Sequence, residues 1–181
     1  MKELSLNILD IAQNSVRANA TLIRIDLIET ETTFTFTVTD NGCGMSESLL
    51  RSVTDPFTTT RTTRKVGLGI PLLKLAAEMT GGYIDITSSV GEDHGTKTKA
   101  HFFKSHIDYT PLGNIVDTVC TLVQGSPSID FVFSHEMPDG SVSLDTRQMR
   151  EILGEQTPLN DPEILLWIKD SLTQEYDEIK K

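Results

Sequence analysis

Segments with apolar residues every three or four positions and segments with apolar residues at every second position follow one another along the sequence. Apolar positions three or four residues apart, together with N-cap residues, predict helices. These helices cover residues 3–18, 46–53, 69–80, 112–124, 146–153 and 162–179. Alternating positions rich in β-branched and aromatic residues predict strands. These strands cover residues 22–29, 33–39, 83–89, 96–103, 129–134 and 141–144. Helices and strands interleaved in this way predict an α/β fold.

Short polar links between neighbouring strands predict how those strands pair. Residues 30–32 and residues 91–95 each join two strands closely enough to form an antiparallel hairpin. Ser46 and Thr146 are suited to cap the helices that follow them, and Pro71 fits the first turn of the helix over 69–80. The expected fold class is an α/β two-layer sandwich, in which helices cover one face of an antiparallel or mixed sheet.

The charge is distributed unevenly over the 181 residues. Residues 1–105 hold 11 Lys and Arg against 12 Asp and Glu, and residues 106–181 hold 5 against 14. The two parts therefore carry −1 and −9 of the net charge of −10. We expect one domain over 1–105 and an acidic α/β extension over 106–181, with the boundary near Ser105. The negative charge argues against nucleic-acid binding.

Composition also bears on where the protein works. No run of about 18 apolar residues predicts a membrane span, so no membrane partner is expected. Two cysteines make neither a disulfide framework nor a zinc site. The first residues lack the apolar core of a secretory signal. Together these features predict a cytoplasmic protein.

Two polar residues on the first predicted helix are the first candidates for chemistry. Asp10 and Asn14 are four residues apart, so their side chains project from the same side of the helix. A carboxylate beside an amide oxygen could orient a water and hold Mg²⁺, which prefers oxygen ligands. The alternative is an ordinary solvated polar face.

A glycine-rich segment follows the second predicted strand directly. It reads Asp-Asn-Gly-Cys-Gly-Met from Asp40 to Met45. Gly42 and Gly44 allow positive φ and a close approach to a flat ligand, and the Asp40 carboxylate can accept a hydrogen bond from an exocyclic amine. The alternative is a hairpin turn, because Asp-Asn-Gly is common in turns.

Residues 57–69 combine hydroxyl groups, cations and a Gly-x-Gly that opens a helix. Cations and the backbone N–H groups of a helix N-terminus together suit a polyphosphate. The segment lacks the full motif of a dinucleotide site or of a P-loop, and the alternative is a solvated basic loop. Further on, Thr96 begins a strand after a glycine, where its hydroxyl could reach a base, although Gly-Thr is commonplace at such junctions.

The order of these four pieces resembles the histidine-kinase-like ATPases, also called the Bergerat or GHKL superfamily. The segment QNSVRANATLIRIDL with DNGCGM resembles MutL-type proteins, and DPFTTTRTTRKVGLGIPLLKLAAEMTGGYIDITSS resembles the catalytic domains of histidine kinases. The resemblance covers about residues 4–103. It implies the Bergerat fold, with a mixed, largely antiparallel sheet, and ATP and Mg²⁺ as cofactors.

The resemblance also implies a role for individual residues. Asp10 takes the position of the general base, Asn14 that of the Mg²⁺ ligand, and Asp40 that of the aspartate bonded to the adenine amine. Further nucleotide contacts are implied for the glycine-rich segment, the lid over residues 57–66, the glycines at the phosphates and the adenine-side threonine. They are Gly42, Gly44, Met45, Phe57, Thr58, Thr59, Arg61, Arg64, Lys65, Val66, Gly67, Leu68, Gly69 and Thr96.

One departure from the family pattern bears on activity. The base position of the hydrolysing members holds Glu, and Asp10 is one methylene shorter, which predicts weak catalysis or none. The expected function is a stand-alone Mg-ATP-binding regulatory protein, a protein kinase or weak ATPase. It would phosphorylate a partner protein or hydrolyse ATP slowly as a switch. The alternative is a non-catalytic nucleotide-binding module. A protein partner is expected, and a homodimer is left open.

Overall fold

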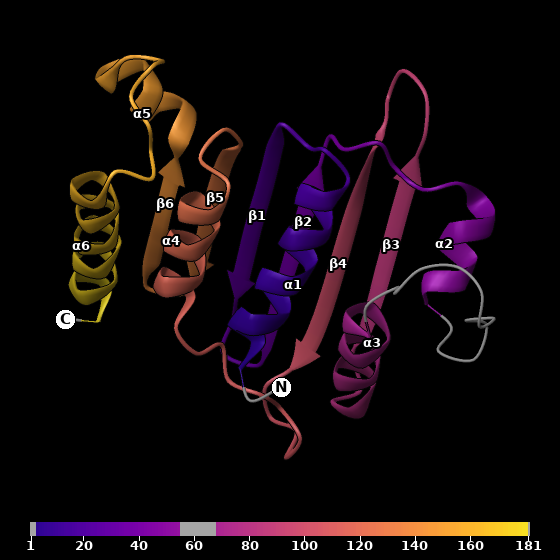
Figure 1. Ribbon diagram of the computed structural model, residues 1–181. Helices are drawn as coiled ribbons and strands as arrows, with labels where there is room; N and C mark the ends of the chain where they lie inside the picture. Colours follow the sequence, from indigo (N-terminus) through magenta and orange to yellow (C-terminus); the bar gives the residue numbers. More distant parts are fainter. Residues whose placement is uncertain (1–2, 55–67, 181) are drawn as a thin grey trace.

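The computed structural model describes residues 3–54 and 68–180, and these residues form the predicted elements (Figure 1). The helices are α1 (Leu4–Arg17), α2 (Glu47–Val53), α3 (Gly69–Met79), α4 (Ile115–Gly125), α5 (Thr146–Leu153) and α6 (Pro162–Ile179). The strands are β1 (Leu22–Glu29), β2 (Thr33–Asp40), β3 (Tyr83–Ser89), β4 (Gly95–Phe103), β5 (Asp130–Met137) and β6 (Gly140–Asp145).

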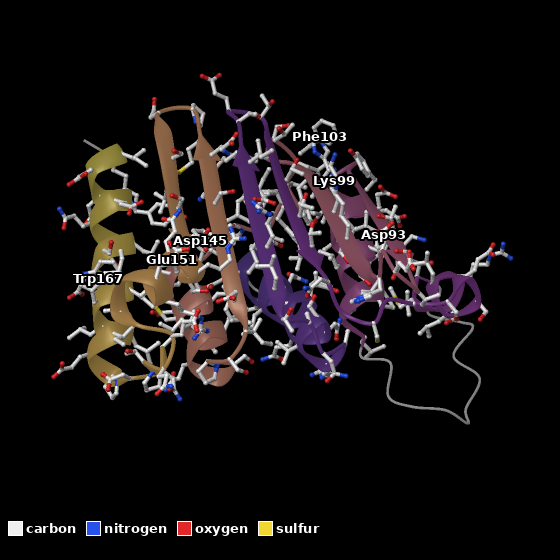
Figure 2. All side chains as sticks on the ribbon, turned by 90° about the horizontal axis from the view of Figure 1, so that it is seen from above. Asp93, Lys99, Phe103, Asp145, Glu151 and Trp167 are labelled. Carbon is white, nitrogen blue, oxygen red and sulfur yellow. The ribbon has the colours of Figure 1, made fainter. Side chains whose placement is uncertain are left out.

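All six strands belong to one mixed sheet with the order β3-β4-β2-β1-β5-β6. Four of the five neighbouring pairs are antiparallel, and β1 and β5 pair in parallel. Helices α1, α3 and α4 lie across one face of the sheet (Figures 1 and 2). The expected α/β two-layer sandwich is therefore confirmed.

The core lies between this helical layer and the sheet. Because side chains alternate along a strand, one set from each strand faces the helices and is buried. In the two central strands this set comprises Ile23, Ile25, Leu27, Phe34, Phe36 and Val38. Helix α1 covers them with Leu4, Ile8 and Ala12, which are also buried. This packing holds α1 directly over the centre of the sheet.

The acidic part of the chain continues the same sheet. Strand β5 pairs with β1 in parallel, with Ile25 opposite Phe133, and β6 adds the edge beyond it. Helix α4 packs beside α1, and buried residues from both parts form one hydrophobic cluster. The division at Ser105 into two domains stays a prediction.

Two helix starts differ from the sequence prediction. Helix α4 begins at Ile115 and not at residue 112, because the Asn114 side chain accepts a hydrogen bond from the Asp117 N–H at 3.0 Å and caps the helix there. The cap of α5 is Asp145, which accepts from the Arg147 N–H. Thr146 is the first helical residue instead, and its buried hydroxyl accepts from the Phe131 N–H at 2.9 Å.

His135 on β5 is buried among polar partners at one end of the sheet. Its Nδ1 lies 2.8 Å from the Tyr176 hydroxyl of α6, and its Nε2 lies 3.3 Å from a Glu29 carboxylate oxygen without hydrogen-bond geometry. The other Glu29 oxygen accepts from Lys104 at 2.5 Å. Burial lowers the pKa of His135, and Glu29 opposes this effect in part. The imidazole is therefore neutral at pH 7.

This buried imidazole should make stability depend on pH. A histidine in the unfolded chain takes up a proton near pH 6.5, whereas folded His135 resists protonation to lower pH. Stability is therefore lost as the pH falls below about 6.5. We expect His135→Gln to lose less stability between pH 7.5 and 5.5 than the wild type, measured by urea denaturation. An unchanged pH dependence in His135→Gln would contradict the prediction.

Candidate functional site

A pocket of about 470 Å³ opens between α1, the end of β2 and the beginning of β4. Helix α1 and the turn after it supply Asp10, Ile11, Asn14, Ser15, Arg17 and Ala18. The sheet, the glycine-rich segment, α2 and α3 supply Asp40, Gly44, Met45, Val53, Ile70, Thr96 and Thr98. The four candidate polar residues, Asp10, Asn14, Asp40 and Thr96, thus share one pocket.

Helix α1 sets the positions of the first two of these residues. Its opposite side is buried, so the residues at positions 10, 14 and 17 form the polar edge that faces the pocket. The Asn14 side-chain oxygen accepts a hydrogen bond from Arg17 at 2.8 Å. Asp10 lies against the first residue of α3, where a Cβ added to Gly69 would come within 1.8 Å of the carboxylate.

Two hydrogen bonds hold the Asp40 carboxylate at the end of β2. One oxygen accepts from the Ser15 hydroxyl at 2.5 Å, and the other accepts from the Gly42 N–H at 2.8 Å. Ser15 is buried on α1, so this contact joins the helix to the strand. Asp40 also stands opposite Thr96 in the register of β2 and β4. The rotamer of this carboxylate is therefore set before any ligand arrives.

The two glycines after Asp40 serve different purposes. Gly44 lines the pocket and has a φ of +71°, and a Cβ there would lie 1.8 Å from the Ser89 carbonyl oxygen. Gly42 does not use the positive φ that a glycine allows, and it does not line the pocket. A Cβ at Gly42 would lie 2.7 Å from the Cβ of Ala18, so this glycine lets the segment pass the end of α1.

Ser88 links the glycine-rich segment to the predicted threonine. Its hydroxyl oxygen accepts a hydrogen bond from the Met45 N–H at 2.8 Å and lies 2.8 Å from the Thr96 hydroxyl. Sequence reasoning missed this residue. The sequence did hold a signal for it, because Ser88 stands opposite Thr96 in the hairpin of β3 and β4. Serine and threonine in facing positions of two strands often share a hydrogen bond.

The remaining predicted site residues fall into two groups. Leu68 is exposed and does not line the pocket, and Gly69 is buried against Asp10 while the next residue, Ile70, reaches the pocket. The other lid predictions lie outside the described residues. They are Phe57, Thr58, Thr59, Arg61, Arg64, Lys65, Val66 and Gly67.

The side chains that could ligate a metal decide which metal ion the pocket can hold. Within 3–54 and 68–180, no three His, Cys, Asp or Glu side chains come together closely enough to hold a metal ion by themselves. Asp10 and Asn14 do present oxygen donors on one side of the pocket. Such a pair suits Mg²⁺, which is commonly bound by one or two protein oxygens, waters and substrate phosphates.

The sequence of this half of the chain matches a known family. Residues 1–106 match the model of the histidine kinase-, DNA gyrase B-, and HSP90-like ATPases. The chain belongs to this family. It therefore carries an ATP-binding domain of the GHKL type, and the recognition made from the sequence motifs is confirmed.

Individual relatives agree with this placement. A protein from Shewanella frigidimarina (strain NCIMB 400), named as a sensor protein, is 28% identical over 103 residues. The match covers 56% of this chain and 15% of that protein. The MutL ATPase domain of Aquifex aeolicus, solved in complex with ADP, is 11% identical and superposes with a TM-score of 0.52. The superposition covers 84% of this chain and 69% of the MutL chain. At this low identity the likeness concerns the fold.

The expected absence of a membrane span can be compared with the helices themselves. None of the helices in the described part of the chain is long and apolar enough to cross a bilayer. The longest, α6, has 18 residues and carries charges along its length.

The contact between Gly44 and Ser89 gives a test of how the pocket is built. Gly44→Ala should destabilise the protein by about 2 kcal/mol or more, because it combines a positive φ with a blocked Cβ position. Gly91→Ala is the matched control. It also has a positive φ but nothing within 4 Å of its Cβ, so it should cost about 1 kcal/mol. Urea denaturation measures both, and equal losses would contradict the close approach.

Proposed function

We propose that the pocket beside α1 binds Mg-ATP and that this protein acts as an ATP-dependent regulator. It either transfers the γ-phosphoryl group to a partner protein or hydrolyses ATP slowly as a switch. One observation supports this most directly: Asp10, Asn14, Asp40 and Thr96 come from three separate stretches of sequence and line the same pocket. Their order matches the motifs of a family whose members bind ATP.

The adenine would lie at the end of β2. A carboxylate is an acceptor and suits the exocyclic amine of adenine, whereas guanine places a carbonyl oxygen there and would be repelled. Ser15 and the Gly42 N–H already hold Asp40 in position, so little side-chain entropy is lost on binding. Thr96, opposite Asp40 in the register, is placed to contact the same base.

The phosphates would extend along α1 toward the start of α3. Helix N-termini favour phosphate groups because their first N–H groups are unpaired and the helix dipole is positive there. Asn14 would supply an oxygen ligand to Mg²⁺, and its Oδ1 would have to share or exchange the hydrogen bond that it accepts from Arg17. The bound cation would neutralise phosphate charge.

The position of Asp10 supports slow chemistry. Its carboxylate lies against Gly69 at the start of α3, close to where the phosphates would end. It is one methylene shorter than the glutamate of the hydrolysing members, and a shift of about 1 Å at a reacting group can cost about 100-fold in rate. The shorter side chain also favours a second candidate function, a non-catalytic module in which ATP binding alone changes the surface presented to a partner.

The adenine assignment can be tested at Asp40. Asp40→Asn removes a charged acceptor from a half-buried position, which costs about 1.5–3 kcal/mol. ATP affinity should therefore fall about 10- to 100-fold in calorimetry, and the preference for ATP over GTP should shrink. The control Asp85→Asn changes an exposed carboxylate on β3 and should bind as wild type. Unchanged nucleotide preference in Asp40→Asn would refute the assignment.

The catalytic assignment can be tested at Asp10 and Asn14. Asp10→Asn should keep ATP binding and lose turnover, since an amide cannot accept the proton of the attacking group. Asn14→Ala should instead lose the part of the affinity that depends on Mg²⁺. Incubation with γ-labelled ATP and cell extract then separates the outcomes: label on a protein indicates a kinase, and free phosphate indicates an ATPase. Turnover at the wild-type rate in Asp10→Asn would exclude the base role.

A further inference from the structure

The acidic part of the chain carries an apolar groove at the edge of the sheet farthest from the ATP pocket. Helices α5 and α6 form its walls, with a volume of about 350 Å³. The lining is almost entirely apolar and consists of Met149, Ile152, Leu153, Glu163, Ile164 and Trp167. In Figure 1, α5 and α6 lie beyond β6, at the opposite end of the sheet from α2 and α3.

The groove exposes side chains that usually lie inside a protein. Ile152 is 84% exposed and Trp167 is 58% exposed, and Leu153 and Leu166 beside them are exposed as well. Figure 2 shows Trp167 on the outer side of α6. Single exposed apolar residues are common, but a cluster around a hollow is typical of an interaction site. A partly buried tryptophan is also the residue type most enriched among binding hot spots.

The charges around the groove select the kind of partner. Each cation of α5 and α6 up to residue 169 is paired: Arg147 with Asp145 at 2.7 Å, Arg150 with Asp130 at 2.8 Å, and Lys169 with Asp117 at 2.9 Å. These pairs leave no unpaired Lys or Arg on α5 or α6.

The acidic side chain that lines the groove is not neutralised in this way. Within the described part of the chain, no cation lies within ion-pair distance of Glu163. Glu163 itself lines the hollow. The groove is thus an apolar surface with an acidic rim at Glu163, on a part of the chain whose net charge is −9.

We infer that this groove docks a basic amphipathic segment of a partner protein. The segment would place one or two aliphatic or aromatic side chains between α5 and α6, with Lys or Arg beside them to meet the acidic rim. This matches the recognition of an amphipathic helix in a groove, in which apolar anchors give affinity and flanking charges give orientation.

Other occupants fit the charges less well. A second copy of the chain bound through the same face would bring two acidic rims together. An anionic membrane surface would repel the acidic rim as well. A basic segment is attracted by both the rim and the apolar lining.

The single tryptophan of the chain lies in the groove and reports its occupation. We would titrate the full-length protein with a synthetic amphipathic helix of leucine and lysine. The control peptide has the same leucine positions, with glutamate in place of every lysine. The basic peptide should shift the Trp167 emission to shorter wavelength and saturate, and the acidic peptide should not. No emission shift with the basic peptide would overturn the proposal.

Matched variants separate docking in the groove from general attraction to an acidic protein. Ile152→Ser should weaken binding roughly 10-fold, as expected for loss of an apolar contact, whereas Ile107→Ser, at another exposed isoleucine, should bind as wild type. Glu163→Lys should weaken binding more than Glu92→Lys, which makes the same charge change on the β3–β4 turn. Equal effects within either pair would overturn the proposal.

Two further measurements test whether the groove is instead occupied by a second copy of the chain or by a membrane. An emission shift that depends on protein concentration alone would assign the groove to a second copy. A shift on addition of vesicles of anionic phospholipid would assign it to a membrane. Either result would overturn the proposal. None of these measurements contains nucleotide, so their outcome is independent of the proposed ATP chemistry.

Discussion

Helix α1 must bury one side against the sheet while its other side forms a wall of the proposed ATP pocket. The buried side, with Leu4, Ile8 and Ala12, places the helix over the central strands. The helical period then leaves Asp10 and Asn14 on the pocket edge. Asp40 is bonded to the same helix through Ser15, whereas Thr96 belongs to the sheet, so a shift of α1 would change how the helical groups stand relative to Thr96.

The link between Ser15 and Asp40 connects that helix to the strand that ends at the pocket. A hydroxyl buried on α1 donates to a carboxylate at the end of β2 at 2.5 Å, and the chain then turns past Ala18 at Gly42. Charge-assisted hydrogen bonds of this kind are stronger than neutral ones. The contact therefore stabilises the fold and prepares the acceptor oxygens of the site at the same time. One contact, between Ser15 and Asp40, therefore serves both the fold and the pocket.

Local patterns were sufficient for the elements and for the motifs, and insufficient for what long-range packing decides. The spacing of Asp10 and Asn14 and the turn after Asp40 depend on nearby residues, so the sequence predicted both. The parallel pairing of β1 with β5 depends on segments about 100 residues apart, and no local period encodes it. Ser15 was missed because a small polar residue on an amphipathic helix reveals its partner only in three dimensions. The cap at Thr146 was wrong because the adjacent Asp145 competes for the same role.

The pocket beside α1 and the groove between α5 and α6 lie on the same sheet, so packed helices connect them. The proposed ATP pocket lies against α1, which packs beside α4, and α4 packs in turn against α6 of the groove. Packed helices and a hydrogen-bonded sheet resist small deformations, so a ligand at either site alters the other only through a difference in affinity between two arrangements of these helices. Helices α1, α4 and α6 form a continuous packed connection between the two surfaces, alongside the hydrogen-bonded strands. Without such a second arrangement, the proposed docking and nucleotide binding would be independent, and the groove would serve only to bring a partner to the protein.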